Sequence, residues 1–237
     1  MNAHPARALR ALLLGLALLA LTAQATNAQQ VPLTADQVTD KVQGFYTSIA
    51  DFQSRFEQTY TDVAADEKRT LTGKVFFKKP GKMRWDYLKN DANNKPSLAK
   101  VLVSNGNEFT IYEADFDQYS KQCLKDSQLP SALSFLMGSG DLKADFNIQL
   151  LPKSPEGTYS LDLTPKQSAS QYKKLIFVVD AKDFSVRKTI IHDPYGNTNE
   201  ISFLAARVNK QLPDEGFQFQ PPQGARAVGS AKDLKCQ

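Results

Sequence analysis

The chain has 237 residues and a formal net charge of +4, and 41% of its residues are hydrophobic, 10% aromatic and 23% charged. These proportions exclude a collagen-like, low-complexity or wholly disordered chain. Arg7 and Arg10 lie in the amino-terminal segment described next, and without them the net charge falls to +2. A charge this small does not favour nucleic-acid binding, so we expect no nucleic-acid partner.

Residues 1–28 have the pattern of a secretory signal peptide. Two arginines precede an apolar run from Ala11 to Leu21, and small residues suited to cleavage follow, ending at Ala25 and at Ala28. The alternative is a membrane anchor, but a helix needs about 20 apolar residues to cross a bilayer. We therefore expect export, cleavage after Ala25 or Ala28, and a single domain over residues 29–237.

The exported part begins with a predicted amphipathic helix. Thr34 and Gln37 fit a capping box, in which each side chain accepts a hydrogen bond from the other residue's backbone N–H. Apolar residues then recur at helical spacing from Val38 to Ile49, which predicts a helix over about residues 35–50. A second helix is predicted over residues 130–137 and a shorter helical turn over 141–146.

Most of the remaining sequence alternates with period two, as half-buried β-strands do. Asn105-Gly106 between two such segments is a strong signal for a two-residue hairpin. Short strands with few intervening helices favour a mainly β fold, an antiparallel sheet or barrel, over a parallel α/β fold. The predicted strands cover residues 52–60, 69–79, 82–87, 100–104, 108–112, 147–151, 159–164, 174–180, 186–192 and 199–208.

The two strands joined by Pro80-Gly81 each have one strongly apolar side. That side carries Leu71, Gly73, Val75 and Phe77 in the first strand and Met83, Trp85 and Tyr87 in the second. Such a surface is either ordinary core or, if helices cover an incompletely closed barrel, the wall of a pocket for acyl chains. Lys79, at the end of this side, is either a turn lysine whose charge reaches water or a functional cation.

Residue sets typical of enzymes are missing. His192 is the only histidine after residue 28, so histidine-based triads and multi-histidine metal sites lack their parts. The sequence has no G-x-S-x-G, no H-E-x-x-H and no phosphate-binding glycine loop. We therefore expect no enzymatic activity, no metal site and no cofactor.

Two cysteines, Cys123 and Cys236, stand 113 positions apart. Because an exported protein meets conditions that permit disulfides, we expect a structural bridge between them, the alternative being two free thiols. Such a bridge would tie the carboxyl end of the chain to its middle. The sequence has no C-x-x-C pair, so redox catalysis is not predicted.

The segment KVFFKKPGKMRWDY, residues 74–87, resembles the signature hairpin of the outer-membrane lipoprotein carrier (LolA) family. Other segments agree with that family in order and spacing, so that the resemblance spans roughly residues 35–228. They are Phe52-x3-Phe56-x-Gln58, the VLVSNG-x2-F-x2-Y segment at 101–112, residues 130–138, residues 193–203, Asn209 to Leu212, and residues 217–224.

This resemblance implies an unclosed antiparallel β-barrel of about eleven strands, covered by a lid of two to three short α-helices. It also implies a monomeric periplasmic carrier that binds the acyl chains of triacylated lipoproteins. Such a carrier receives its cargo from an ATP-driven Lol transporter of the inner membrane and delivers it to the acceptor LolB or an equivalent. The alternative is a lipid- or lipoprotein-sensing module of the same architecture without carrier activity.

Twelve side chains are expected to line the lipid site. Parity and family position together indicate Phe52, Phe56, Val75, Phe77, Met83, Trp85, Leu133 and Leu136, and pattern alone indicates Val103, Phe109, Ile201 and Phe203. Lys79 stands where the family usually has an arginine that holds the lid shut, so Lys79 is the expected lid latch. Lysine keeps the charge but lacks the planar fork of donors.

Overall fold

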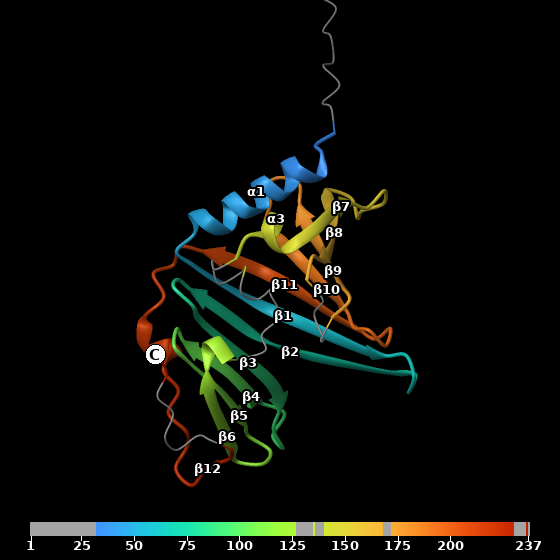
Figure 1. Ribbon diagram of the computed structural model, residues 1–237. Coiled ribbons are helices and arrows are strands. Elements are labelled where there is room, and N and C mark those ends of the chain that lie inside the picture. The colour runs from blue at the N-terminus through green and yellow to red at the C-terminus, as the bar shows by residue number, and fades with distance from the viewer. Residues whose placement is uncertain (1–31, 127–134, 136–139, 168–171, 230–235, 237) are drawn as a thin grey trace, which may run out of the picture. The chain divides into compact units, whose positions relative to one another are not determined.

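The computed structural model describes residues 32–126, 135, 140–167, 172–229 and 236, and contains one sheet of twelve strands (Figure 1). The strands are β1 (Asp51–Asp62), β2 (Glu67–Lys78), β3 (Lys82–Asn90), β4 (Pro96–Asn105), β5 (Glu108–Glu113), β6 (Gln118–Cys123), β7 (Phe146–Leu150), β8 (Thr158–Pro165), β9 (Lys174–Asp180), β10 (Val186–His192), β11 (Thr198–Val208) and β12 (Arg226–Ala227). The helices are α1 (Ala35–Ser48) and α3 (Leu142–Asp145), with 3₁₀ turns η1 (Leu124–Asp126) and η2 (Asp214–Phe217).

The sheet follows the order β12-β6-β5-β4-β3-β2-β1-β11-β10-β9-β8-β7. All neighbouring strands are antiparallel except β12 and β6, which are parallel. The first strand lies in the middle of the sheet, because β1 pairs with β2 on one side and with β11 on the other. The end strands β12 and β7 are not neighbours, so the sheet is unclosed. The predicted class is confirmed, with twelve strands where about eleven were expected.

Helix α1 begins at the predicted capping box. The Thr34 hydroxyl accepts a hydrogen bond from the Gln37 amide at 3.2 Å, and the Gln37 side chain accepts one from the Thr34 amide at 2.9 Å. The helix ends at Ser48, two residues before the expected end. Its buried side includes Val38, Val42 and Tyr46, which pack into the main apolar cluster of the molecule.

The other predicted helical segments are only partly described. Residues 141–146 contain α3, whose N-cap Asp141 accepts hydrogen bonds from the amides of Lys143 and Ala144. The predicted helix over 130–137 lies outside the described residues apart from Phe135. That side chain is buried and contacts the rings of Tyr46 and Phe177, and so belongs to the same cluster as α1.

The sheet has two faces, which we name by what covers them. The inner face is the side on which Phe56, Val75, Trp85 and Phe177 form one buried cluster with α1. The outer face is the opposite side, where Val101, Val103 and Tyr112 form a second, smaller buried cluster with Phe219 and Ala225. Side chains alternate between the two faces along every strand.

Residues 209–229, which we call the strap, cover part of the outer face. Arg84 donates a hydrogen bond to the Gly216 carbonyl at 3.2 Å, and Asp214 lies between Lys78 and Lys82 with N–O distances of 2.5 and 2.7 Å. Beyond the strap, Cys236 is bonded to Cys123 at the end of β6, with a Cα–Cα distance of 5.3 Å. The predicted disulfide is therefore confirmed.

Candidate functional site

The inner face of strands β11, β1, β2 and β3 carries a continuous surface of aromatic rings. Phe56 on β1 pairs with Phe203 on β11, while Phe77 and Trp85 follow on β2 and β3. The Phe56 ring centroid lies 4.9 Å from that of Trp85, and Phe77 and Phe203 lie 5.9 and 6.3 Å from Trp85. These edge-to-face and tilted contacts give the face a large, closely packed apolar surface.

Gly73 on β2 makes room for this aromatic packing. A Cβ atom placed on Gly73 would lie only 2.6 Å from the Phe56 ring, closer than real side chains approach each other. The ring of Phe56 therefore lies directly against the backbone of β2 at Gly73. This is a close approach that only glycine permits, and it explains why the apolar side of the predicted strand is interrupted at this residue.

Nine of the twelve side chains expected at the site lie in the same buried cluster. They are Phe52, Phe56, Val75, Phe77, Met83, Trp85, Phe109, Ile201 and Phe203. Leu133 and Leu136 lie outside the described residues. The structure brings the nine together on one face; lipid binding by them is taken up as a proposal below.

Val103 lies on the outer face, so its expected inward direction is wrong. Val103 pairs with Arg84 and packs in the outer cluster, whereas its neighbour Leu102 pairs with Trp85 and packs against the inner cluster. Sequence parity could not choose between them, because β4 buries apolar residues on both faces. What distinguishes them is the register between β3 and β4, which places Ser104 opposite Met83 and Leu102 opposite Trp85.

The last turn of α1 is held by Lys79. Its ammonium group donates hydrogen bonds to the carbonyl oxygens of Tyr46 at 2.5 Å and Thr47 at 2.8 Å. Carbonyls in the last turn of a helix have no partner within the helix and carry partial negative charge, so a cation there is favourable. Desolvation lowers the pKa of Lys79. The residue thus joins the β2–β3 turn to the carboxyl end of α1.

Two buried polar atoms on the inner face lack hydrogen-bond partners within the described part of the chain. These are Nε1 of Trp85, whose side chain is almost wholly buried, and Oε1 of Gln58. The other side of the Gln58 amide donates to Asn199 at 2.8 Å. A buried donor without an acceptor costs about 1–3 kcal/mol, so such an atom calls for an explanation. Trp85 was expected at the site for its apolar ring, whereas Gln58 was not among the expected site residues.

A pocket of about 350 Å³ opens where the inner face becomes polar. It is lined by Gln58, Leu71, Tyr87, Ala99, Lys100, Glu113, Asp115 and Phe116. Leu71 and Phe116 are 49% and 63% exposed, and burial raises the pKa of the Tyr87 phenol to about 12. The pocket adjoins the aromatic surface through Tyr87, whose ring centroid lies 5.0 Å from that of Phe56.

Two other kinds of functional feature are not found among the described residues, namely a metal site and a membrane-spanning helix. Among them, no three His, Cys, Asp or Glu side chains are placed to hold a metal ion. In the same part of the chain, no helix has both the length and the hydropathy that a membrane crossing requires.

Comparison with known proteins agrees with this architecture. A family model described as outer membrane lipoprotein carrier protein LolA matches residues 47–220. An outer-membrane lipoprotein carrier protein of Cupriavidus pinatubonensis is 29% identical over 209 residues, covering 87% of this chain and 94% of the relative. The protein of the same name from Methylobacillus flagellatus is 26% identical over 190 residues, covering 80% of this chain and 88% of the relative.

Among solved structures, an uncharacterized conserved protein from Thermus thermophilus superposes with a TM-score of 0.51 at 13% sequence identity. The superposition covers 82% of this chain and 98% of that protein, and it supports the fold alone. The family model, in contrast, spans the inner-face strands, the Lys79 turn and most of the strap. Because that match extends over well more than half of the sequence, the chain belongs to the LolA family of outer-membrane lipoprotein carrier proteins.

Proposed function

We propose that this protein carries acylated proteins through the periplasm, with their acyl chains held against the inner face of the sheet. Its family is one of non-enzymatic carriers, in agreement with the lack of catalytic residue sets in the sequence. The observation that carries the proposal is the continuous aromatic surface of Phe56, Phe77, Trp85 and Phe203 under a non-covalently held helix.

Lipid entry requires the cover of the inner face to move. Val75 and Met83 are wholly buried and Trp85 is only 2% exposed, so acyl chains reach these residues only when α1 and its neighbours separate from the sheet. Separation exposes apolar surface to water, which is unfavourable without cargo. An acyl chain covers that surface again, and each methylene removed from water contributes about 0.8 kcal/mol.

Lys79 is the proposed latch of this cover. Hydrogen bonds that involve a charged group contribute about 1.5–3 kcal/mol each to stability. Ten methylenes of an acyl chain contribute about 8 kcal/mol by the figure given above, more than the two bonds to Tyr46 and Thr47. Cargo can therefore open a latch of this strength, and the latch can close again when cargo leaves. The lysine replaces the arginine expected from the family pattern.

The unpartnered Trp85 Nε1–H suits a cargo that brings a carbonyl group with it. Ester and amide carbonyls join acyl chains to a lipoprotein's terminal cysteine, and such an oxygen would satisfy the indole donor. Gln58 and Tyr87, at the polar end of the inner face, would then lie beside the cargo's polar groups.

The rest of the proposed route follows from the family pattern. An ATP-driven Lol transporter of the inner membrane is the proposed donor, and the acceptor LolB or an equivalent is the proposed receiver. The carrier acts as a monomer. Each transfer proceeds when the receiving protein binds the cargo more tightly than the giving protein does. A change of the carrier between its closed and open states can supply that difference in affinity.

The test is extraction of a triacylated lipoprotein. Delipidated protein is mixed with membrane vesicles that contain the lipoprotein, and the supernatant is analysed for a carrier–lipoprotein complex. Wild-type protein should release the lipoprotein from the vesicles. Phe77→Glu or Trp85→Glu should abolish release, because a charged carboxylate is costly on the surface that receives the chains. Thr72→Glu, on an exposed position of the same strand β2, is the matched control.

Circular dichroism establishes that each variant is folded. Trp85 is the only tryptophan, so its emission and its single indole N–H resonance report lipid entry directly. Failure of folded wild-type protein to release lipoprotein would refute the carrier proposal. Release without later transfer to vesicles that hold the acceptor would instead favour the lipid-sensing alternative.

A further inference from the structure

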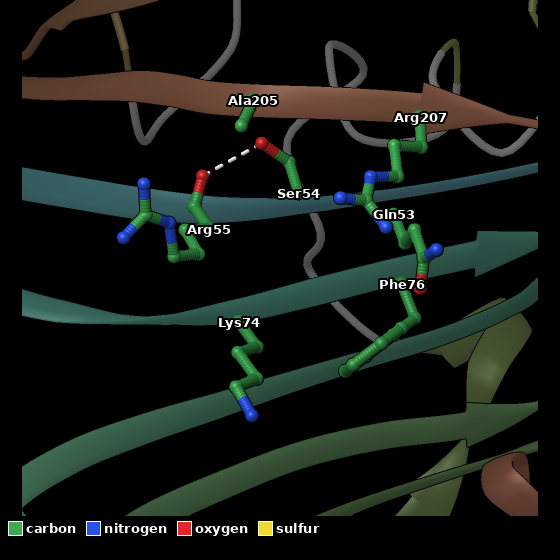
Figure 2. Close-up of a pocket in the computed structure, with 7 residues that line it drawn as sticks. All are labelled: Gln53, Ser54, Arg55, Lys74, Phe76, Ala205 and Arg207. Carbon is green, nitrogen blue, oxygen red and sulfur yellow. Dashed lines mark hydrogen bonds between the residues drawn. The ribbon is translucent and has the colours of Figure 1, made fainter.

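A pocket of about 300 Å³ lies on the outer face, behind the inner aromatic surface. It is lined by Gln53, Ser54, Arg55, Lys74, Phe76, Ala205 and Arg207, from strands β1, β2 and β11, and we call it the cationic pocket (Figure 2). In Figure 2, Arg55 and Lys74 lie on one side of it, and Arg207, Gln53 and Phe76 lie on the other. The residues proposed to hold lipid take no part in it.

A β-bulge creates this pocket. Gln53 pairs with Arg207 but Arg55 pairs with Leu204, so two residues of β11 face one residue of β1. The extra residue, Ala205, has φ 55°, a left-handed conformation that alanine rarely adopts. The Ser54 hydroxyl lies 2.7 Å from the Arg55 carbonyl oxygen and 3.0 Å from that of Leu204, so its single O–H can donate to either carbonyl at the bulge. Bulges of this kind re-aim side chains and occur often beside functional sites.

The charges around the pocket are not neutralised. Arg55 and Lys74 stand directly opposite each other on β1 and β2, and like charges in that position are destabilising. Both side chains and that of Arg207 are exposed, and none of the ion pairs in the described chain includes them. Asp86 stands opposite Lys74 on β3, but its carboxylate pairs with Arg84 at 2.8 Å. Three unpaired cations around one hollow can bind an anionic group without first losing a partner of their own.

An apolar groove of about 230 Å³ adjoins the cationic pocket. It is lined by Phe76, Arg84, Asp86, Leu212, Pro213, Gly216 and Phe217, so Phe76 belongs to both hollows. One wall of the groove is the strap, which Asp214 fixes to Lys78 and Lys82. The outer face therefore presents an apolar hollow and a cationic hollow side by side, at the place where the strap ceases to cover the sheet.

We propose that these two hollows form a docking site for an extended acidic segment of a partner protein. A carboxylate of the segment binds between Arg55, Lys74 and Arg207, where guanidinium groups can donate two parallel hydrogen bonds. A neighbouring apolar side chain of the segment enters the groove. An anionic bilayer fits less well. Membrane-binding clusters carry about 4–8 cations, whereas Arg84, Lys78 and Lys82 beside this surface are already paired with Asp86 and Asp214, which leaves three cations around the pocket unpaired within the described residues.

The proposal is tested with a peptide that alternates leucine and glutamate over six residues. Backbone amide resonances of the ¹⁵N-labelled full chain should shift saturably at Arg55, Lys74 and Ala205, at Leu212 and along residues 214–217. The triple variant Arg55→Gln/Lys74→Gln/Arg207→Gln should bind the peptide at least about tenfold more weakly, the loss expected when roughly 1.4 kcal/mol of charge-assisted binding is removed. The variant Lys68→Gln/Lys95→Gln/Lys153→Gln changes the net charge equally at exposed positions elsewhere and should bind as the wild type does.

The thermal midpoint of each variant separates binding from folding. Removal of the Arg55–Lys74 repulsion should leave the triple variant at least as stable as the wild type, so weaker binding could not be blamed on unfolding. Absence of saturable shifts, or equal binding by the triple variant, would overturn the proposal. Shifts of the same residues that are stronger with vesicles of phosphatidylglycerol and phosphatidylethanolamine than with the peptide would also overturn the proposal. None of these outcomes depends on whether the inner face binds lipid.

Discussion

The two faces of the sheet bury apolar residues under covers of different kinds. On the inner face the cover includes α1, which is held by packing, by two hydrogen bonds from Lys79, and by one from the Val186 amide to the Tyr46 hydroxyl at 3.1 Å. On the outer face the cover is the strap, which runs between the Asp214 ion pairs and the disulfide of Cys236. The disulfide limits how far the strap can separate from the sheet, whereas no disulfide holds the described part of the inner cover. We therefore expect the cover of the inner face to move and the cover of the outer face to stay in place.

The largest difference in stability between the two faces should be seen at two adjacent phenylalanines that point to opposite faces. Phe77 is only 2% exposed on the inner face, whereas Phe76 is half-buried on the outer face. Phe77→Ala should lower the free energy of unfolding by about 3–5 kcal/mol, because it leaves a cavity in a closed cluster. Phe76→Ala should cost clearly less. Urea denaturation measures both, and equal losses would show that the two faces are packed alike.

Removal of the disulfide should come next in size. Cys123→Ser with Cys236→Ser opens a link between residues 113 positions apart and should lower stability by about 2–4 kcal/mol. At a temperature where the variant is folded, lipoprotein extraction should remain at the wild-type level. A variant that is folded but unable to extract lipoprotein would mean that the outer cover also controls the inner face.

Substitution of Lys79 should weaken the attachment of α1 without affecting the strap. Lys79→Ala removes both bonds to the last turn of α1 and should speed amide hydrogen exchange in that turn. Because one partly exposed ammonium group makes both bonds, the loss of local stability should be about 1.5–3 kcal/mol in total. Lys79→Arg should restore protection, since guanidinium keeps the charge and adds donors.

Lys78→Ala is the matched control for Lys79. The two residues are neighbours, but the Lys78 ammonium bonds Asp214 and the Leu212 carbonyl of the strap. Its loss should speed exchange in the strap and leave α1 protected. Faster exchange of α1 in both variants would contradict the separation of the two covers.

The smallest expected change in stability comes from substitution of Asp214. Hydrogen bonds from Lys78 and then Lys82 lower the pKa of this carboxyl from 3.8 to about 2. Because the folded-state pKa is the lower one, the carboxylate stabilises the fold above pH 3.8, and this contribution is lost as the pH falls through about 2. Asp214→Asn should lower the thermal midpoint slightly at neutral pH and not near pH 2. In 1 M salt the difference should shrink, because both partners lie near solvent.

Much of the inner face could be predicted from the sequence, because alternation and turn signals act locally. The capping box of Thr34 and Gln37, the Asn105-Gly106 hairpin and the apolar sides of β2 and β3 each follow from neighbouring residues. The disulfide also follows, because only one pairing of two cysteines exists.

The features that the sequence did not reveal depend on contacts between distant segments. Strand β6 is absent from the predicted strands, because QYSKQC has no apolar alternation and owes its place to pairing with β5 and β12. Val103 was misplaced because the strap, more than a hundred residues further along the chain, buries the outer side of β4. The cationic pocket likewise needs the bulge between β1 and β11.

The short strand β12 covers the edge of the sheet that β6 would otherwise expose. An uncovered edge offers free N–H and C=O groups to strands of other molecules and so invites fibrous association. Arg226 and Ala227 pair with β6 on that edge, the Val228 amide bonds the Tyr119 carbonyl at 2.8 Å, and the Cys236 bridge keeps this stretch of chain from drifting away. A reducing environment would therefore endanger this protein less by unfolding single molecules than by letting many of them join edge to edge.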